Sequence, residues 1–88
     1  MTKAEIRRAS DPYVKVVYWD EEDRIYVGQC PELFFGGVHG RDQAKVYADL
    51  LAAVEDVVEG MLRKGQPLPR PRVMPVLRAT LEAVTPAA

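Results

Sequence analysis

The chain has 88 residues, which corresponds to one small domain because soluble domains commonly run to about 100–200 residues. Its composition, 48% hydrophobic and 28% charged, is that of a globular protein. A net charge of −1 argues against a protein that binds nucleic acid by charge alone, and a single cysteine excludes an internal disulfide. The charged N-terminus and short apolar runs argue against a signal peptide and a membrane-spanning helix. We therefore expect a cytoplasmic protein with no membrane partner.

The N-terminal half is expected to begin with an irregular polar lead-in, residues 1–12, although a helical turn over Lys3–Ala9 is an alternative. Residues 13–19 and 24–30 are rich in β-branched and aromatic side chains, which predicts two strands. The acidic residues between them cannot be buried together, so they predict a solvated turn that makes the pair a β-hairpin. These residues are Asp20, Glu21, Glu22 and Asp23.

The middle of the chain predicts a third strand and a long helix. Pro31 ends the second strand, and residues 33–40 predict an antiparallel strand whose glycines permit a bulge or a close backbone approach. Residues 42–64 predict a helix with Asp42 as its N-cap and Gly65 as its left-handed stop. Its apolar residues recur at spacings of three and four. They are Tyr47, Leu50, Leu51, Val54, Val57, Val58, Met61 and Leu62.

The C-terminal segment follows a stiff proline-rich linker, residues 66–71, and fits two structures equally well. One pattern alternates as in a half-buried strand and comprises Leu77, Ala79, Leu81 and Ala83. The other has helical spacing and comprises Met74, Leu77, Leu81 and Val84. We favour the strand, because Pro75 disfavours a helix and Val76 and Thr80 are β-branched.

The expected fold is therefore α+β with the order β-β-β-α-β, an antiparallel sheet with one long helix packed on one face. The last strand either returns to its own sheet or is exchanged between subunits. The chain divides into residues 1–12, 13–71 and 72–88. A homodimer or homotetramer is expected, with Leu77, Ala79 and Leu81 in the contact between subunits.

Few residues are candidates for catalysis. Cys30 would need a base, and the single histidine, His39, lies on the adjacent predicted strand where the two could approach. Because no third residue orients them, a buried structural thiol and a strand-end histidine are favoured. The glycines Gly36, Gly37 and Gly40 lack the Lys-Ser/Thr ending of a phosphate loop. No metal or cofactor is expected.

The acidic residues of the hairpin turn permit three interpretations. A solvated turn is favoured, and a docking surface for a basic partner is the second interpretation. The third is a vestigial nuclease in which Asp20 and Glu32 hold Mg²⁺.

The order of these features, from Tyr13 to Pro71, resembles the HicB-like antitoxin domain. The shared order is a strand, an acidic turn, a strand ending in Pro-acidic-Leu, a glycine-containing strand, a long helix and a Gly-x-x-Leu-Pro-x-Pro exit. The residues that carry it are Pro31, Glu32, Leu33, Gly36, Gly37, Gly40, Gly65, Pro69 and Pro71.

The resemblance implies a partial ribonuclease-H-like sheet without the nuclease's catalytic carboxylates. It also implies a non-enzymatic antitoxin that binds and blocks a small, basic, mRNA-cleaving toxin, with the acidic turn and Glu32 as partner contacts. The chain departs from the family at the helix start, residues 40–44, which lacks a Ser/Thr cap and paired glutamates. Residues 72–88 are too few for a ribbon-helix-helix or helix-turn-helix, so direct DNA binding is not expected. The alternative function is an orphan oligomeric structural domain without a toxin partner.

Overall fold

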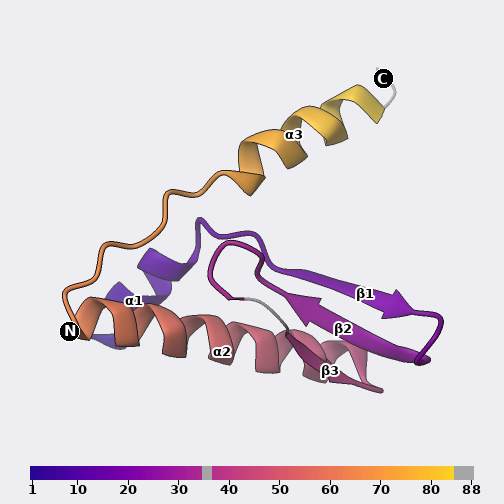
Figure 1. Ribbon diagram of the computed structural model, residues 1–88, viewed down its shortest axis with the longest axis horizontal. Coiled ribbons are helices and arrows are strands. Elements are labelled where there is room, and N and C mark those ends of the chain that lie inside the picture. The colour runs from indigo at the N-terminus through magenta and orange to yellow at the C-terminus, as the bar shows by residue number, and fades with distance from the viewer. Residues whose placement is uncertain (35–36, 85–88) are drawn as a thin grey trace.

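The computed structural model describes residues 1–34 and 37–84 of the chain. Its elements, in chain order, are α1 (Lys3–Ser10), β1 (Val16–Asp20), β2 (Ile25–Gln29), β3 (Val38–Gly40), α2 (Gln43–Arg63) and α3 (Val73–Val84). The three strands form one antiparallel sheet in the order β1-β2-β3. In Figure 1, α2 runs along one side of the sheet and α3 projects away from this body. The expected α+β fold with a long helix on an antiparallel sheet is therefore confirmed.

The N-terminal lead-in is a helix, so the prediction of an irregular segment is wrong. Thr2 caps α1 by accepting a hydrogen bond from the Glu5 backbone N–H, and its hydroxyl donates to the Glu5 carboxylate. This Thr-x-x-Glu capping box was the overlooked sequence signal. Ile6 is buried and joins the core, and α1 packs against α2. A chain with so small a core gains apolar burial from this added helix.

The hairpin has the expected connection but a shorter first strand. Pairing runs from Val16 opposite Gln29 to Asp20 opposite Ile25. The strand begins after Lys15, whose ammonium donates to the carbonyl of Ser10 at 2.6 Å. That contact places a positive charge at the negative C-terminal end of α1.

The third strand is also shorter than the predicted span 33–40, of which residues 35–36 lie outside the described residues. The chain turns after β2, where Leu33 N–H donates to the Cys30 carbonyl. Of the described residues in this span, Val38–Gly40 pair with β2. Gly37 packs so closely on β2 that an added Cβ would lie 2.2 Å from the Gly28 carbonyl oxygen. The glycine thus permits the close backbone approach that was expected.

The long helix supplies most of the core. Asp42 caps it as predicted, accepting from the Lys45 N–H, and Gly65 follows its end at φ +70°. Its fully buried residues are Val46, Leu50, Val54 and Val58. Val46 was missing from the predicted stripe, whereas Tyr47, which was included, is 46% exposed. The stripe is therefore rotated slightly toward Val46.

The C-terminal segment is the helix α3, so the favoured prediction of a strand is wrong. Pro75 is the third residue of α3, where its missing N–H would have had no intrahelical partner. The hydroxyl of Thr80 donates to the Val76 carbonyl at 3.0 Å, which accommodates a β-branched polar residue in the helix. In a helix, Ala79 faces away from Leu77 and Leu81, so these three residues do not share one face.

We expect the close packing of α2 on β2 to make Gly28 intolerant of larger side chains. A Cβ at Gly28 would lie 3.1 Å from Val38, 3.2 Å from Val46 and 3.3 Å from Leu50. Gly28→Val should lower the free energy of unfolding by about 1–3 kcal/mol through overpacking. Gly60→Ala, a helical position with nothing within 4 Å, should raise it by about 0.5–1 kcal/mol. Urea unfolding followed by tryptophan fluorescence measures both, and an unaffected Gly28→Val variant would contradict the packing.

Candidate interaction surfaces

The face of the sheet opposite α2 is uncovered by any helix in the described part of the chain. Because strand side chains alternate, the register places Tyr18, Val27 and His39 side by side on this face. We call it the open face, and its residues are Val16, Tyr18, Asp20, Ile25, Val27, Gln29 and His39. Val16 and Tyr18 are 40% and 43% exposed. An apolar sheet surface is therefore left in contact with solvent.

A shallow hollow of about 280 Å³ lies beside this face where β3 is too short to accompany β2. Ile25, Val27 and Gln29 of β2 line it, together with His39 of β3 and Asp23 of the turn. The hollow therefore joins the apolar sheet surface to the acidic turn.

The acidic turn is built around Asp20. Its carboxylate accepts from the backbone N–H groups of Glu22 at 2.9 Å and Asp23 at 3.2 Å. Its carbonyl accepts from Arg24 N–H at 2.7 Å, which closes the turn with Arg24 at φ 55°. Asp20 is thus a structural residue, and the turn is solvated as expected.

The remaining acidic side chains divide into two kinds. Glu21 accepts from the Trp19 indole at 2.7 Å and pairs with Arg24 at 3.3 Å. Within the described residues, the carboxylates of Glu22 and Asp23 have no hydrogen-bond or ion-pair partner. They are the acidic groups that are available to a basic partner.

Aromatic residues flank the same turn. Trp19 is 43% exposed and packs edge-on against Tyr26, with ring centroids 5.1 Å apart. This pair lies on the α2 side of the hairpin, whereas Tyr18 lies on the open face. Exposed Trp and Tyr next to charged groups are typical of residues that dominate protein interfaces.

Glu32, the other predicted partner contact, lies elsewhere. Its Oε2 accepts from the backbone N–H of Arg72, and the Tyr13 hydroxyl donates to the Pro69 carbonyl. The other carboxylate oxygen of Glu32, Oε1, is buried and has no hydrogen-bond partner among the described residues. We call Tyr13 and Glu32 the linker clamp, because they hold the chain that leads to α3.

The carboxylates proposed for a vestigial nuclease are not brought together. Asp20 pairs with Ile25 at one end of β2, and Glu32 follows its other end. The four residue-to-residue steps from Ile25 to Gln29 alone span about 13 Å at 3.3 Å each. Among residues 1–34 and 37–84, no group of three or more His, Cys, Asp or Glu side chains could hold a metal ion.

Cys30 and His39 lie on opposite faces of the sheet, so the possible approach of the two is not seen. Cys30 is fully buried in the core beneath the sheet, whereas His39 is exposed on the open face. Burial is the main cause of the raised pKa of the Cys30 thiol, which the ammonium of Lys15 partly opposes. The thiol is therefore protonated and inaccessible, as a structural residue is.

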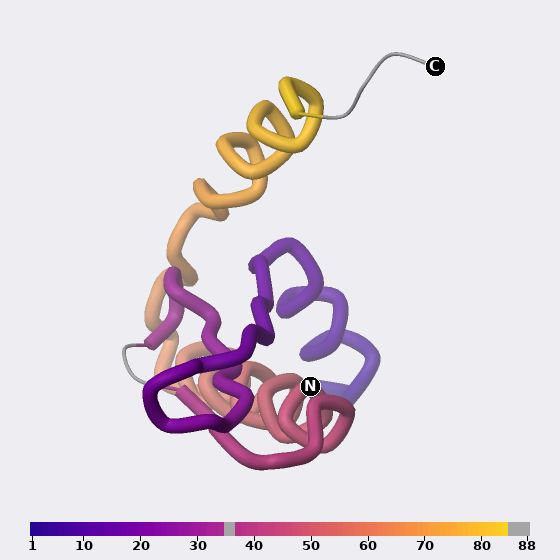
Figure 2. The backbone as a smooth tube through the Cα atoms, turned by 90° about the vertical axis from the view of Figure 1, so that its right-hand side faces the viewer, coloured from indigo at the N-terminus to yellow at the C-terminus, as the bar shows by residue number. Residues whose placement is uncertain are grey.

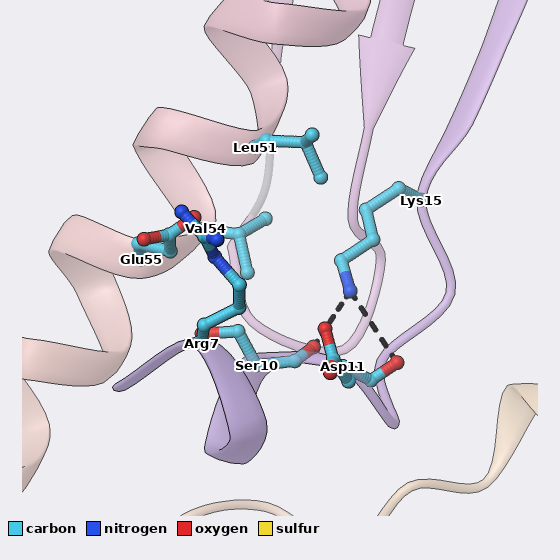
Figure 3. A pocket seen from close by; sticks show the side chains of 7 residues that line it. All are labelled: Arg7, Ser10, Asp11, Lys15, Leu51, Val54 and Glu55. Atoms are coloured by element: carbon cyan, nitrogen blue, oxygen red, sulfur yellow. Dashed lines mark hydrogen bonds between the residues drawn. The ribbon is translucent and has the colours of Figure 1, made fainter. Parts of the chain in front are cut away.

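A small cavity of about 90 Å³ lies between α1 and α2 (Figure 3), large enough for about three waters at about 30 Å³ each. Its lining includes Arg7, Lys15 and Glu55. The ammonium of Lys15 is directed to the carbonyls of Ser10 and Asp11, at 2.6 and 3.4 Å. Its hydrogen bonds go to α1, so the cavity is a packing gap between helices.

Comparison with protein-family models, curated proteins and solved structures gave no match. In the described ranges, no helix has the length and apolar character needed to span a membrane.

Sequence reasoning missed the two contacts that hold the linker. Tyr13 was assigned to a strand, and Glu32 to a surface shared with the acidic turn. The sequence indicates only that Tyr13, an aromatic residue next to Pro12, is suited to burial. It does not indicate that Tyr13 contacts a residue more than 50 positions away. Such a contact requires knowledge of where the linker runs.

We expect the free energy of unfolding to fall in alkaline solution because of Cys30 and Tyr13. Burial raises the pKa of both groups above their ordinary values of 9.0 and 10.0. As the pH rises past those values, the unfolded chain loses these protons first, so native stability declines until the folded-state pKa is passed. Urea unfolding at pH 8, 9 and 10 measures this. Cys30→Ala should reduce the decline, and an unchanged slope would contradict the assignment.

We expect the clamp to protect the linker from proteolysis. Trypsin does not cut before Pro71, so Arg72-Val73 is the bond to follow. Glu32→Ala removes a hydrogen bond worth about 0.5–1.5 kcal/mol and should accelerate cleavage there about 2- to 10-fold. Glu32→Gln keeps an acceptor and is the matched control. Equal rates for all three proteins would show that the clamp does not hold the linker.

Proposed function

We propose that this chain is a non-enzymatic protein-binding module with an antitoxin-like role, which binds and blocks a small, basic toxin that cleaves mRNA. The observation that carries the proposal is one continuous surface formed by the open face and the acidic turn. Its centre is apolar, at Val16, Tyr18 and Val27, and its edge bears the unpaired carboxylates of Glu22 and Asp23. Protein interfaces combine an apolar centre with a polar rim in this way.

The charge of the rim supports a basic partner. The four acidic residues of the turn and Arg24 sum to −3 within five positions, in a chain whose net charge is −1. Such a concentration steers a positively charged protein to the surface and orients it on arrival. The effect depends on ionic strength, since exposed charges are screened over about 8 Å at 0.15 M salt.

The resemblance to HicB-like antitoxins gives the partner its class. The residues that carry it span Tyr13–Pro71, and the observed antiparallel sheet backed by one long helix agrees with the fold that the resemblance implies. Glu32 is left out of the proposed surface, since it binds the linker and lies away from the acidic turn.

The test is co-expression with any small basic protein that an adjacent gene encodes, followed by affinity purification and an RNA-cleavage assay. We expect the purified chain to bind that protein and to suppress cleavage. Tyr18→Ala should weaken binding about 5- to 30-fold, because a central tyrosine commonly contributes 1–2 kcal/mol or more. Tyr47→Ala is the matched control, since Tyr47 is equally exposed, at 46%, on α2. Its affinity should remain within about twofold of the wild type.

A charge-reversal pair tests the rim separately. Asp23→Lys should slow association about 2- to 5-fold and reduce its salt dependence, whereas Asp56→Lys on exposed α2 should change neither. A folded chain that neither binds the neighbouring basic protein nor suppresses RNA cleavage would overturn the proposal.

The second candidate function is an oligomeric structural domain with no toxin partner. The observation that favours it is α3, which contains no buried residue. A stable homo-oligomer without any small basic gene product nearby would select this alternative.

A further inference from the structure

The helix α3 lies apart from the body of the described chain. It contacts none of the other described helices or strands, and none of its residues is buried. Figures 1 and 2 both show it extending from the body at the end of the linker. An isolated helix of 12 residues is marginal in water, because nucleation is costly and propagation adds little. An apolar surface packed against α3 would supply the stability that the isolated helix lacks.

The apolar residues of α3 have a spacing that is symmetric about Ala79. Met74, Leu77, Leu81 and Val84 are separated by three, four and three residues, which places them along one side of the helix. Read in either direction, the spacing is the same. Two such helices that run antiparallel therefore match residue by residue, as a two-fold contact requires.

We infer that α3 pairs antiparallel with α3 of a second copy of this chain, with the two-fold axis level with Ala79 but on the opposite, apolar side of the helix. Met74 then faces the partner's Val84, and Leu77 faces the partner's Leu81. This places 70%-exposed Val84 against an apolar side chain instead of water. The proposal goes beyond the antitoxin-like function and does not depend on a toxin.

A recess at the base of α3 extends this contact. Pro12, Pro71 and Pro75 line it with Met74 and Arg78, and its volume is about 480 Å³. Since Met74 faces the partner's Val84, the end of the partner helix reaches the recess. A stable interface buries about 1,200–2,000 Å² in total, more than three helical turns alone provide. The recess supplies the further apolar area, and the linker clamp sets its shape by holding Arg72.

The charges on α3 also select the antiparallel direction. Arg78 and Glu82 are its only charged residues, so the helix is neutral. Both lie on the same flank of the apolar side. An antiparallel pair brings this flank of each helix together, and Arg78 lies about 3 Å along the axis from the partner's Glu82 at 1.5 Å rise per residue. A parallel pair places the two flanks on opposite sides of the contact, where the charges do not meet.

The first experiment measures the molar mass of the full chain by size exclusion with light scattering over a range of concentrations, without any other protein. We expect about twice the chain mass of 9.9 kDa. Leu77→Glu should raise the dissociation constant at least about tenfold and give the monomer mass. Ala79→Glu, on the opposite face of the same helix, is the matched control and should remain dimeric.

Because α3 lies outside the core, the urea midpoint of the body should be the same in all three proteins. A monomeric wild type, or a Leu77→Glu variant with unchanged mass, would overturn the proposal. Neither result depends on the toxin, so a failure here is distinct from a failure of the proposed function.

The second experiment tests the direction of pairing. Met74→Cys and Val84→Cys variants are mixed, oxidised mildly and analysed by mass spectrometry. We expect disulfides between position 74 of one chain and position 84 of the other, and few between identical positions. Links between identical positions would indicate a parallel pair and would contradict the inferred register. The native Cys30 is fully buried and does not compete.

Discussion

The close approach of α2 to β2 at Gly28 is the constraint on which the rest of this structure depends. The sheet has only three strands and one covered face, so its stability rests on how tightly Val46 and Leu50 pack against it. The absence of a side chain at Gly28 lets the helix lie at that distance. The alternation of side chains along the strands places the opposite residues, among them Tyr18 and Val27, on the face that no described helix covers. The covered core and the open face are thus the two sides of one sheet.

Two polar arrangements occupy opposite ends of β2 and serve different purposes. At one end, the carboxylate of Asp20 organises a turn and leaves Glu22 and Asp23 exposed. At the other end, Glu32 binds the linker through the backbone of Arg72. A single acidic surface that included Glu32 would have required the linker to run elsewhere. The two ends of β2 thus carry separate acidic groups, one at the exposed turn and one that binds the linker before α3.

The sequence was informative where a local pattern had one solution. The hairpin followed from β-branched runs around four consecutive acids, and α2 followed from a long helical repeat with Asp42 and Gly65 at its ends. The pattern from Met74 to Val84 fitted both a strand and a helix. The structure has the helix, in which Pro75 lies in the first turn, where a proline is tolerated. Of the candidate surfaces, the acidic turn was predictable. The open face required the register, and the linker clamp required a contact between residues 40 or more positions apart.

Both hydrogen bonds of the linker clamp are made to backbone atoms of the linker, a carbonyl of Pro69 and an amide of Arg72. These two hydrogen bonds therefore do not depend on the side chains of most linker residues. Substitution of Arg70, for example, should leave the linker bound to Tyr13 and Glu32. Position 72 must merely retain an N–H, so any residue except proline satisfies it. In related proteins, the linker side chains should therefore vary. The two clamp residues, Tyr13 and Glu32, should stay the same.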